Sequence, residues 1–245
     1  MNEIIKSLQD RKSVRVYEDK PISLEDKRVI LQSAMEAPTA GNQQMYTILD
    51  ITDQDIKDKL AVSCDNQPFI AKAPMVLIFC ADMQKWFDAF VEGGANPRKP
   101  AEGDFALSIT DAVIAAQNAV VAAESLGIGS CYIGDIMEQC EFHRELLQLP
   151  EYVFPAAMLV FGYPTKQQKE RQKPKRCRLE DIVQENRYHR RDGKQIRKMF
   201  EKETVEKGKT FEKWTRAFCE RKYNSEFSKE MSRSVREYLK RYQGE

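Results

Sequence analysis

The stretch SITDAVIAAQNAVVAAESLG, residues 108–127, is the strongest structural signal in this chain of 245 residues. Its apolar residues recur at intervals of three and four, which is the spacing of one face of an α-helix. Gly127 at its end is typical of a helix terminus. Alanine is so frequent that a second helix could approach closely. The stretch therefore predicts a long helix in the core or at a subunit interface.

Apolar segments of strand length lie on both sides of this helix. They are YTILDIT (46–52), MVLIFCA (75–81), GSCYIG (129–134) and YVFPAAMLVFGYP (152–164). Helices are predicted over residues 24–37, after a capping box that begins at Ser23, and over residues 54–62, after Asp53. Strands and helices alternate without internal repeats, which predicts an α+β or α/β sandwich.

The composition, with 42% hydrophobic and 31% charged residues, is that of a soluble globular protein. No stretch approaches 18 consecutive apolar residues, and the first residues are unlike a secretory signal, so we expect a cytoplasmic protein without a membrane span. The six cysteines form no C-x-x-C pair, which predicts reduced thiols and no metal site. His143 has Glu141 and Glu145 as neighbours, which favours a position at the surface.

The net charge of +1 hides a division of the chain. Residues 1–186 hold 21 basic and 28 acidic side chains, whereas residues 187–245 hold 18 and 10. The division predicts a core over residues 1–190 and a helical extension over residues 191–245 that packs on it, joined near RRDGK (190–194). An alternative is that the basic helices bind nucleic acid. Acidic residues interleaved with the basic ones disfavour that alternative.

Known catalytic motifs are missing from the sequence. No Walker loop, G-x-G-x-x-G or G-x-S-x-G follows a predicted strand, so any chemistry is expected to come from a cofactor. Near the start, Arg11, Lys12 and Arg15 surround Ser13. Three cations and a hydroxyl on a short arc can hold a phosphate, although the same pattern also occurs on ordinary solvated surfaces.

Five short segments, in this order, resemble the FMN-dependent nitroreductase family over about residues 1–190. They are R-x-S-x-R-x-Y (11–17), APTAGNQQ (37–44), NQPFIAKAP (66–74), LGIGSCYIGD (126–135) and KPKRCRLEDIVQENRY (173–188). The late K-P-K-R stretch and the helical tail look most like the NADPH-preferring, oxygen-insensitive flavin reductase and nitroreductase branch. The resemblance implies an α+β three-layer sandwich, with a mixed sheet flanked by helices, and an intertwined homodimer with two FMN sites.

The resemblance also implies which residues bind FMN. They are Arg11, Lys12, Ser13, Arg15, Pro38, Thr39, Ala40, Asn42, Gln44, Gln67, Ile133, Gly134, Lys173, Lys175 and Arg176. The loop at 38–44 would come from the partner subunit, and either Lys173 or Lys175 would accompany Arg176 at the phosphate. Asp135 stands where the family often has a small residue, and we expect it to point away from the flavin ring.

The implied function is an oxidoreductase that passes hydride from NADPH or NADH, through FMN, to nitroaromatic, quinone or flavin acceptors by a ping-pong mechanism. No catalytic side chain and no metal is implied. The basic segment that follows residue 188 would reach the 2′-phosphate of NADPH, or would be a solvated helix start. A flavin-binding protein without turnover is a further alternative.

Overall fold

The computed structural model describes residues 2–206 and 208–244. The chain divides into two compact units. Residues up to Gln172, together with those from Glu230 onward, form the first unit, and Lys173–Lys229 form the second. The division at residue 190 that the charge distribution predicts stays a prediction.

The first unit contains a four-stranded sheet in the order β1-β2-β4-β3. The strands are β1 (Tyr46–Asp50), β2 (Met75–Asp82), β3 (Gly129–Ile133) and β4 (Val153–Gly162), and all four match predicted segments. Every residue of the two central strands, β2 and β4, is buried, because each carries apolar side chains on both faces.

The sheet differs from the expected mixed one in its strand directions. All three strand pairs are antiparallel, and the one parallel contact among the described strands is an isolated bridge between Ser13 and Ser130. An apolar run shows that a strand is buried, but it does not show in which direction the chain crosses the sheet.

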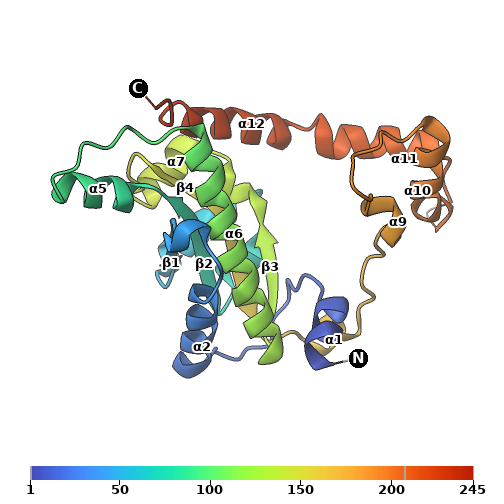
Figure 1. The fold of residues 1–245 in the computed structure, drawn as a ribbon. Helices are drawn as coiled ribbons and strands as arrows, with labels where there is room; N and C mark the ends of the chain where they lie inside the picture. Colours follow the sequence, from blue (N-terminus) through green and yellow to red (C-terminus); the bar gives the residue numbers. More distant parts are fainter. Residues whose placement is uncertain (1, 207, 245) are drawn as a thin grey trace. The chain divides into compact units, whose positions relative to one another are not determined.

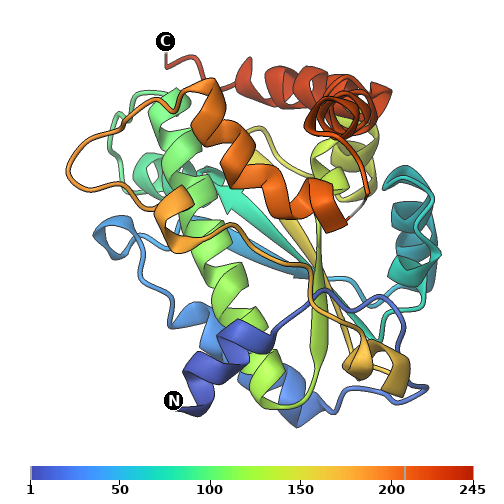
Figure 2. The same cartoon turned by 90° about the vertical axis from the view of Figure 1, so that its right-hand side faces the viewer.

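Helices cover both faces of the sheet. On one face, α2 (Leu24–Met35) and α6 (Glu102–Ser125) share an apolar core with Leu77 and Phe79 of β2. On the other, α3 (Gln54–Ser63) and the short α4 (Pro68–Ala71) share a second core with Val76 and Ile78. Figures 1 and 2 show α6 lying across the first face. The predicted α+β class with three layers is confirmed.

Helix α6 is the predicted alanine-rich helix. By length and composition alone it could cross a membrane, yet 44% of its most apolar window is buried inside the protein. Its buried side chains include Ala112, Ala116 and Ala119. Asp111 is also buried, and its carboxylate accepts hydrogen bonds from the backbone N–H groups of Ala40 and Met45, each at 3.1 Å. These features are those of a core helix.

The remaining elements are short helices and the helices of the tail. They are α1 (Glu3–Asp10), η1 (Ala40–Asn42), α5 (Gln84–Glu92), η2 (Gly134–Met137), α7 (Cys140–Leu146), α8 (Lys166–Glu170), α9 (Leu179–Ile182), α10 (Gly193–Glu206), α11 (Phe211–Phe218), η3 (Cys219–Tyr223) and α12 (Glu226–Leu239). Helix α10 begins at Gly193, inside the range 190–194 where a linker is predicted, and that range lies within the second unit. Tyr238 and Tyr242 are fully buried in the core of the first unit, where they pack against Phe154 and Phe105.

His143 is buried, and the prediction of a surface position is wrong. The imidazole has no exposed area, and both of its ring nitrogens have partners. One nitrogen is 2.8 Å from the Ser63 hydroxyl and the other is 2.7 Å from the carbonyl oxygen of Glu138. Burial of a polar ring is tolerated when its hydrogen bonds are made inside the protein. The neighbouring glutamates occupy other faces of α7.

Candidate functional site

The basic segment at residues 11–17 forms an extended arm along the edge strand β3. The backbone N–H of Val14 donates to the carbonyl of Ser130 at 2.9 Å, and Ser13 pairs with Ser130 in the parallel bridge. Farther along, the N–H of Glu18 donates to the carbonyl of Tyr163 at 2.8 Å. The arm is therefore fixed by backbone hydrogen bonds to the sheet.

The cations of this arm are not neutralised by acids. None of Arg11, Lys12 and Arg15 has a carboxylate oxygen within 4.0 Å among the residues that the structure describes. The Lys12 ammonium instead donates to the backbone carbonyls of Lys169 and Arg171, at 2.5 and 2.6 Å. Arg171 in turn donates to the carbonyl of Ser13 at 2.5 Å. In the neighbouring segment, Lys169 is paired with Glu18 at 3.2 Å. Among the described residues, the positive charges that stay without a paired carboxylate are therefore those of the arm itself.

Two buried polar atoms at this arm lack hydrogen-bond partners within the described chain. They are the Nε of Arg11 and the hydroxyl oxygen of Ser130. A buried donor without a partner costs about 1–3 kcal/mol, so a ligand that supplies an acceptor here would be stabilised. A phosphate monoester offers three oxygens and close to two negative charges. The donors present therefore fit the phosphate end of FMN.

Arg15 connects the arm to the start of α4. Its guanidinium lies 5.8 Å from the centre of the Phe69 ring. It also lies near the Cys131 thiol, whose pKa is raised by burial and lowered less strongly by the charge of Arg15 and a hydrogen bond from Ser13. Ser13 and Arg15 therefore face the same side of the arm, toward β3.

Gln67, Ile133 and Gly134 lie next to this group. Ile133 ends β3, and the exposed Gly134 begins η2. The Gln67 side-chain amide donates to the carbonyl of Cys64 at 2.7 Å and to the Asp135 carboxylate at 3.0 Å. The first unit thus gathers the predicted residues of the arm, of the start of α4 and of the end of β3 at one place.

The predicted loop at Pro38–Gln44 is anchored elsewhere in the first unit. It includes the turn η1 and is held by Asp111 of α6 through the N–H of Ala40. Gln44 N–H donates to the Thr39 hydroxyl at 3.2 Å, while Asn42 and Gln44 adopt left-handed backbone angles, with φ of 57° and 49°. No hydrogen bond joins this loop to the basic arm in the described part of the chain.

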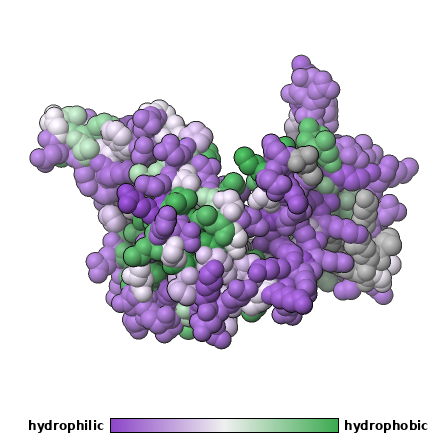
Figure 3. All heavy atoms as spheres, turned by 90° about the horizontal axis from the view of Figure 1, so that it is seen from below, coloured by the Kyte–Doolittle hydropathy of each residue, from purple (hydrophilic) through white to green (hydrophobic). Residues whose placement is uncertain are grey.

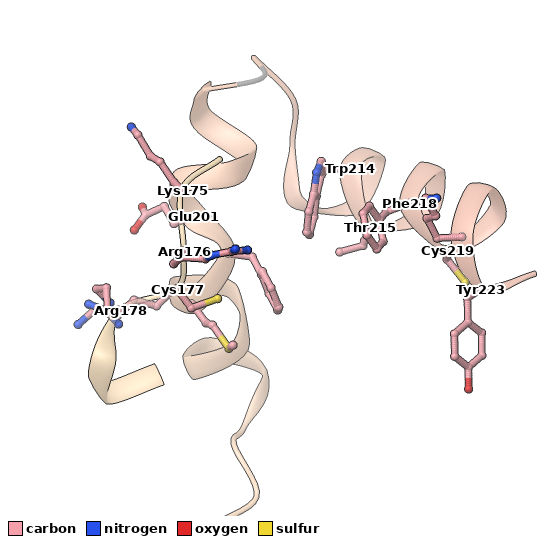
Figure 4. A pocket seen from close by; sticks show the side chains of 14 residues that line it. Lys175, Arg176, Cys177, Arg178, Glu201, Trp214, Thr215, Phe218, Cys219 and Tyr223 are labelled. Carbon is pink, nitrogen blue, oxygen red and sulfur yellow. The ribbon is translucent and has the colours of Figure 1, made fainter. Parts of the chain in front are cut away.

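The last three predicted residues, Lys173, Lys175 and Arg176, belong to the second unit. That unit contains a cavity of about 670 Å³ whose wall includes Lys175, Arg176 and Lys198 beside the aromatic rings of Trp214 and Phe218. Figure 4 shows the Arg176 side chain directed toward α11, whereas Lys175 points away. The cavity combines cationic and aromatic groups.

Sequence reasoning missed several residues of the site. The family motif begins only at the K-P-K-R stretch and does not include Lys169 and Arg171, although KERQK at 169–173 is itself basic. The hydrogen bond between Asp135 and Gln67 joins residues 68 positions apart and leaves no local pattern in the sequence.

Comparison with known proteins gives a consistent result. The nitroreductase family model matches residues 8–163. The FMN reductase [NAD(P)H] of Bacillus subtilis (strain 168) is 37% identical over 166 residues, which are 67% of this chain and 67% of that protein. The oxygen-insensitive NADPH nitroreductase of Salmonella typhimurium (strain LT2) is 31% identical over 194 residues, or 79% and 78% of the two chains.

Solved structures agree over the whole length. The structure of Bacillus megaterium NfrA2 covers 100% of both chains, with a TM-score of 0.84 and 32% sequence identity. The NADPH:FMN oxidoreductase of Vibrio harveyi, complexed with NAD+, covers 97% of this chain with a TM-score of 0.82 and 25% identity. The sequence motifs, the layered fold and these matches together establish that the chain belongs to the nitroreductase family.

Proposed function

We propose that this protein is an FMN-dependent oxidoreductase that uses NADPH or NADH to reduce nitroaromatic, quinone or flavin acceptors. The observation that carries the proposal is the set of unneutralised cations on the basic arm, with the buried Nε of Arg11 left without a partner. Such a site fits a phosphate-bearing cofactor. The relatives named as FMN reductases and NADPH nitroreductases support the reaction class.

The predicted residues would hold FMN at its phosphate end and at its pyrimidine edge. Arg11, Ser13 and Arg15 would bind the phosphate and ribityl chain, and Gln67 would meet the pyrimidine edge. The exposed backbone at Gly134 would lie along the ring, where a main-chain N–H can stabilise developing charge. When bound, FMN supplies a ring that accepts a hydride and passes it on. No acid–base side chain is assigned, because proximity and orientation account for the rate.

By the resemblance, Arg176 and either Lys173 or Lys175 remain proposed ligands of the phosphate. Lys12 would contribute differently from Arg11, Ser13 and Arg15. Its ammonium is held by two backbone carbonyls, so its role is to fix the segment at 169–171 beside the arm. This assignment makes Lys12 a matched control for Arg15.

A second subunit would complete the site. The loop from Pro38 through Thr39, Ala40 and Asn42 to Gln44 is anchored on α6, and we infer that it serves the site of the partner in a homodimer. Apolar side chains at the surface of the first unit support this inference. Ile4 and Leu8 of α1 are 64% and 48% exposed, and Val113 of α6 is 39% exposed. Figure 3 shows hydrophobic side chains on the surface of this unit.

The six cysteines are all free thiols, which supports the proposal of a cytoplasmic protein.

The alternative of a flavin-binding protein without turnover makes a different prediction for the purified protein. Steady oxidation of NADPH or NADH by the purified protein, in the presence of a quinone, would exclude that alternative.

The test of the proposed function is whether the protein binds FMN. We expect a yellow protein with one non-covalent FMN per chain after desalting. Arg15→Ala should weaken FMN binding by roughly tenfold or more, because a hydrogen bond to a charged group contributes about 1.5–3 kcal/mol. Lys12→Ala should change it less. A preparation that stays colourless after incubation with FMN would contradict the proposal, and equal effects of the two substitutions would contradict the assigned roles.

A further inference from the structure

We propose that Asp135 is a positioning residue for the flavin, and that it holds the Gln67 amide so that the amide oxygen faces the N3–H of the pyrimidine edge. This inference rests on the proposed function, because it assumes that FMN occupies the site beside Gly134. It concerns a carboxylate to which the family resemblance assigns no role, and which the sequence predicts to point away from the ring.

The hydrogen bonds of Gln67 determine which way its amide is turned. The amide nitrogen is 2.7 Å from the carbonyl oxygen of Cys64 and 3.0 Å from a carboxylate oxygen of Asp135. A carbonyl and an ionised carboxylate can only accept hydrogen bonds. Both contacts therefore require the NH₂ end of the amide, and together they use both of its N–H groups. The amide oxygen is the end that remains to meet a ligand.

The backbone of Gln67 is fixed as well. Its N–H donates to the carbonyl of Ala61 at 2.8 Å, and its own carbonyl accepts from the N–H of Ile70 at 3.0 Å. The two preceding residues, Asp65 and Asn66, adopt left-handed angles with φ of 62° and 50°, so the turn that delivers Gln67 has a defined shape. Asp135 follows the end of β3, and among the described residues it supplies the one hydrogen bond to the amide from outside this turn.

The chemistry of the ligand matches this orientation. The pyrimidine edge of a flavin presents one N–H donor between two carbonyl acceptors, so an amide oxygen opposite N3 gives a good hydrogen bond. If the amide turned over, two donors would face each other. Without Asp135, only the Cys64 carbonyl would oppose that rotation, and the population of the productive orientation would fall.

The negative charge of Asp135 must be separated from its hydrogen bond. The charge of Asp135 affects two neighbouring groups. Burial is the larger cause and the charge of Asp135 the second, and together they raise the pKa of Cys64 to about 12 and that of Glu138 to about 7. Asp135→Asn keeps an oxygen that can accept from Gln67 but removes the charge. Asp135→Ala removes both. The pair of variants therefore distinguishes positioning from electrostatics.

The test measures FMN affinity by fluorescence titration for the wild type, D135A, D135N, Q67A and the double variant D135A/Q67A. We expect D135A and Q67A each to weaken binding roughly five- to tenfold, the size of one hydrogen bond. The double variant should bind no more weakly than Q67A, because Asp135 acts through Gln67. D135N should bind within about threefold of the wild type. With FMN labelled with ¹⁵N at N3, the N3 resonance of D135N should match that of the wild type, and that of D135A should match Q67A.

Wild-type affinity and a wild-type N3 resonance in D135A would overturn the proposal, as would a D135N variant that behaves like D135A. Melting curves without FMN identify any variant that fails to fold. In that event Asp135→Ser, whose hydroxyl is too short to reach the amide, takes the place of D135A. A wild-type protein that does not bind FMN would instead refute the proposed function, and this inference with it.

Discussion

Neighbouring cations of the basic arm have different surroundings. Lys12 donates to two backbone carbonyls, whereas Arg15 lies over Phe69 and Arg11 keeps a buried Nε without a partner in the described chain. The difference follows from the extended conformation of the arm, in which successive side chains point to opposite sides. Arg11, Ser13 and Arg15 share one side. The sequence shows the cluster, but the alternation becomes informative only once the segment is known to be extended.

The surroundings of Glu138 change the pKa of its carboxyl group. Its side chain is buried, and one carboxylate oxygen lacks a hydrogen-bond partner within the described residues. Burial is the main reason that its pKa rises to about 7, and the charges of Asp135, Asp65 and Glu230 raise it further. The folded protein therefore keeps a proton on Glu138 at a pH where the unfolded chain has lost it.

The resulting prediction concerns stability against pH. Because the folded pKa is above the unfolded value of 4.5, the stabilisation by protonated Glu138 is complete below about pH 4.5 and is lost as pH rises through about 7. Glu138→Gln should leave the free energy of unfolding nearly unchanged at pH 4.5 and raise it at pH 8 by about 1–3 kcal/mol. Denaturant unfolding of both proteins across this range measures the difference.

Glu92→Gln provides the control for this measurement, because Glu92 is exposed at the end of α5. Burial lowers the pKa of the nearby His143, so the imidazole reduces stability at acid pH in every variant. That contribution cancels when variant and wild type are compared at one pH. A difference between Glu138→Gln and the wild type that does not change with pH would contradict the prediction.

At the scale of elements, the close packing of the arm on the sheet depends on small residues. A Cβ at Gly129 would lie 2.5 Å from a methyl group of Val14, and a Cβ at Gly162 would lie 2.5 Å from the Tyr17 ring. The two glycines therefore allow the arm to lie directly on β3 and β4. The sequence alone does not show this packing, since no local pattern reports a contact between residues 14 and 129.

Replacing Gly129 tests this packing. Gly129→Ala should displace the arm, lower the free energy of unfolding by about 1–3 kcal/mol and weaken FMN binding, because the arm carries Arg11, Ser13 and Arg15. Gly103→Ala is the matched control, since a Cβ there meets nothing within 4 Å. Thermal unfolding and FMN titration give the two readouts. Wild-type values of both in Gly129→Ala would show that the arm tolerates the extra methyl group.

Elements were predicted better than the relations between them. The capping hydrogen bonds at Ser23 and Asp53 confirm two helix starts, because capping is local and is encoded within three residues. The strands β2 and β4 were equally clear from their apolar runs. Strand direction and the burial of His143 were not predicted correctly, since both depend on distant partners such as Ser63.

At the scale of the whole molecule, the predicted FMN residues fall into three groups. The arm, Gln67 and Gly134 meet in the first unit, the loop at 38–44 is anchored on Asp111, and Lys173, Lys175 and Arg176 belong to the second unit. Sequence motifs could identify all three groups because each is a short local segment. They could not show which groups act in one chain and which act across a dimer.

A homodimer would explain both the separate loop and the exposed apolar residues, and it gives the last prediction. Light scattering should yield a mass near twice 28.4 kDa. Val113 lies on the half-exposed face of α6. Val113→Glu should produce a monomer that also loses FMN, because no loop from a partner subunit would then complete its site. Val62→Glu is the matched control: Val62 is 66% exposed on α3, on the opposite face of the sheet, and this variant should remain a dimer with bound FMN. A Val113→Glu monomer that still binds FMN as tightly as the wild type would show that one chain completes the site, and the role of the loop at 38–44 would have to be sought within its own subunit.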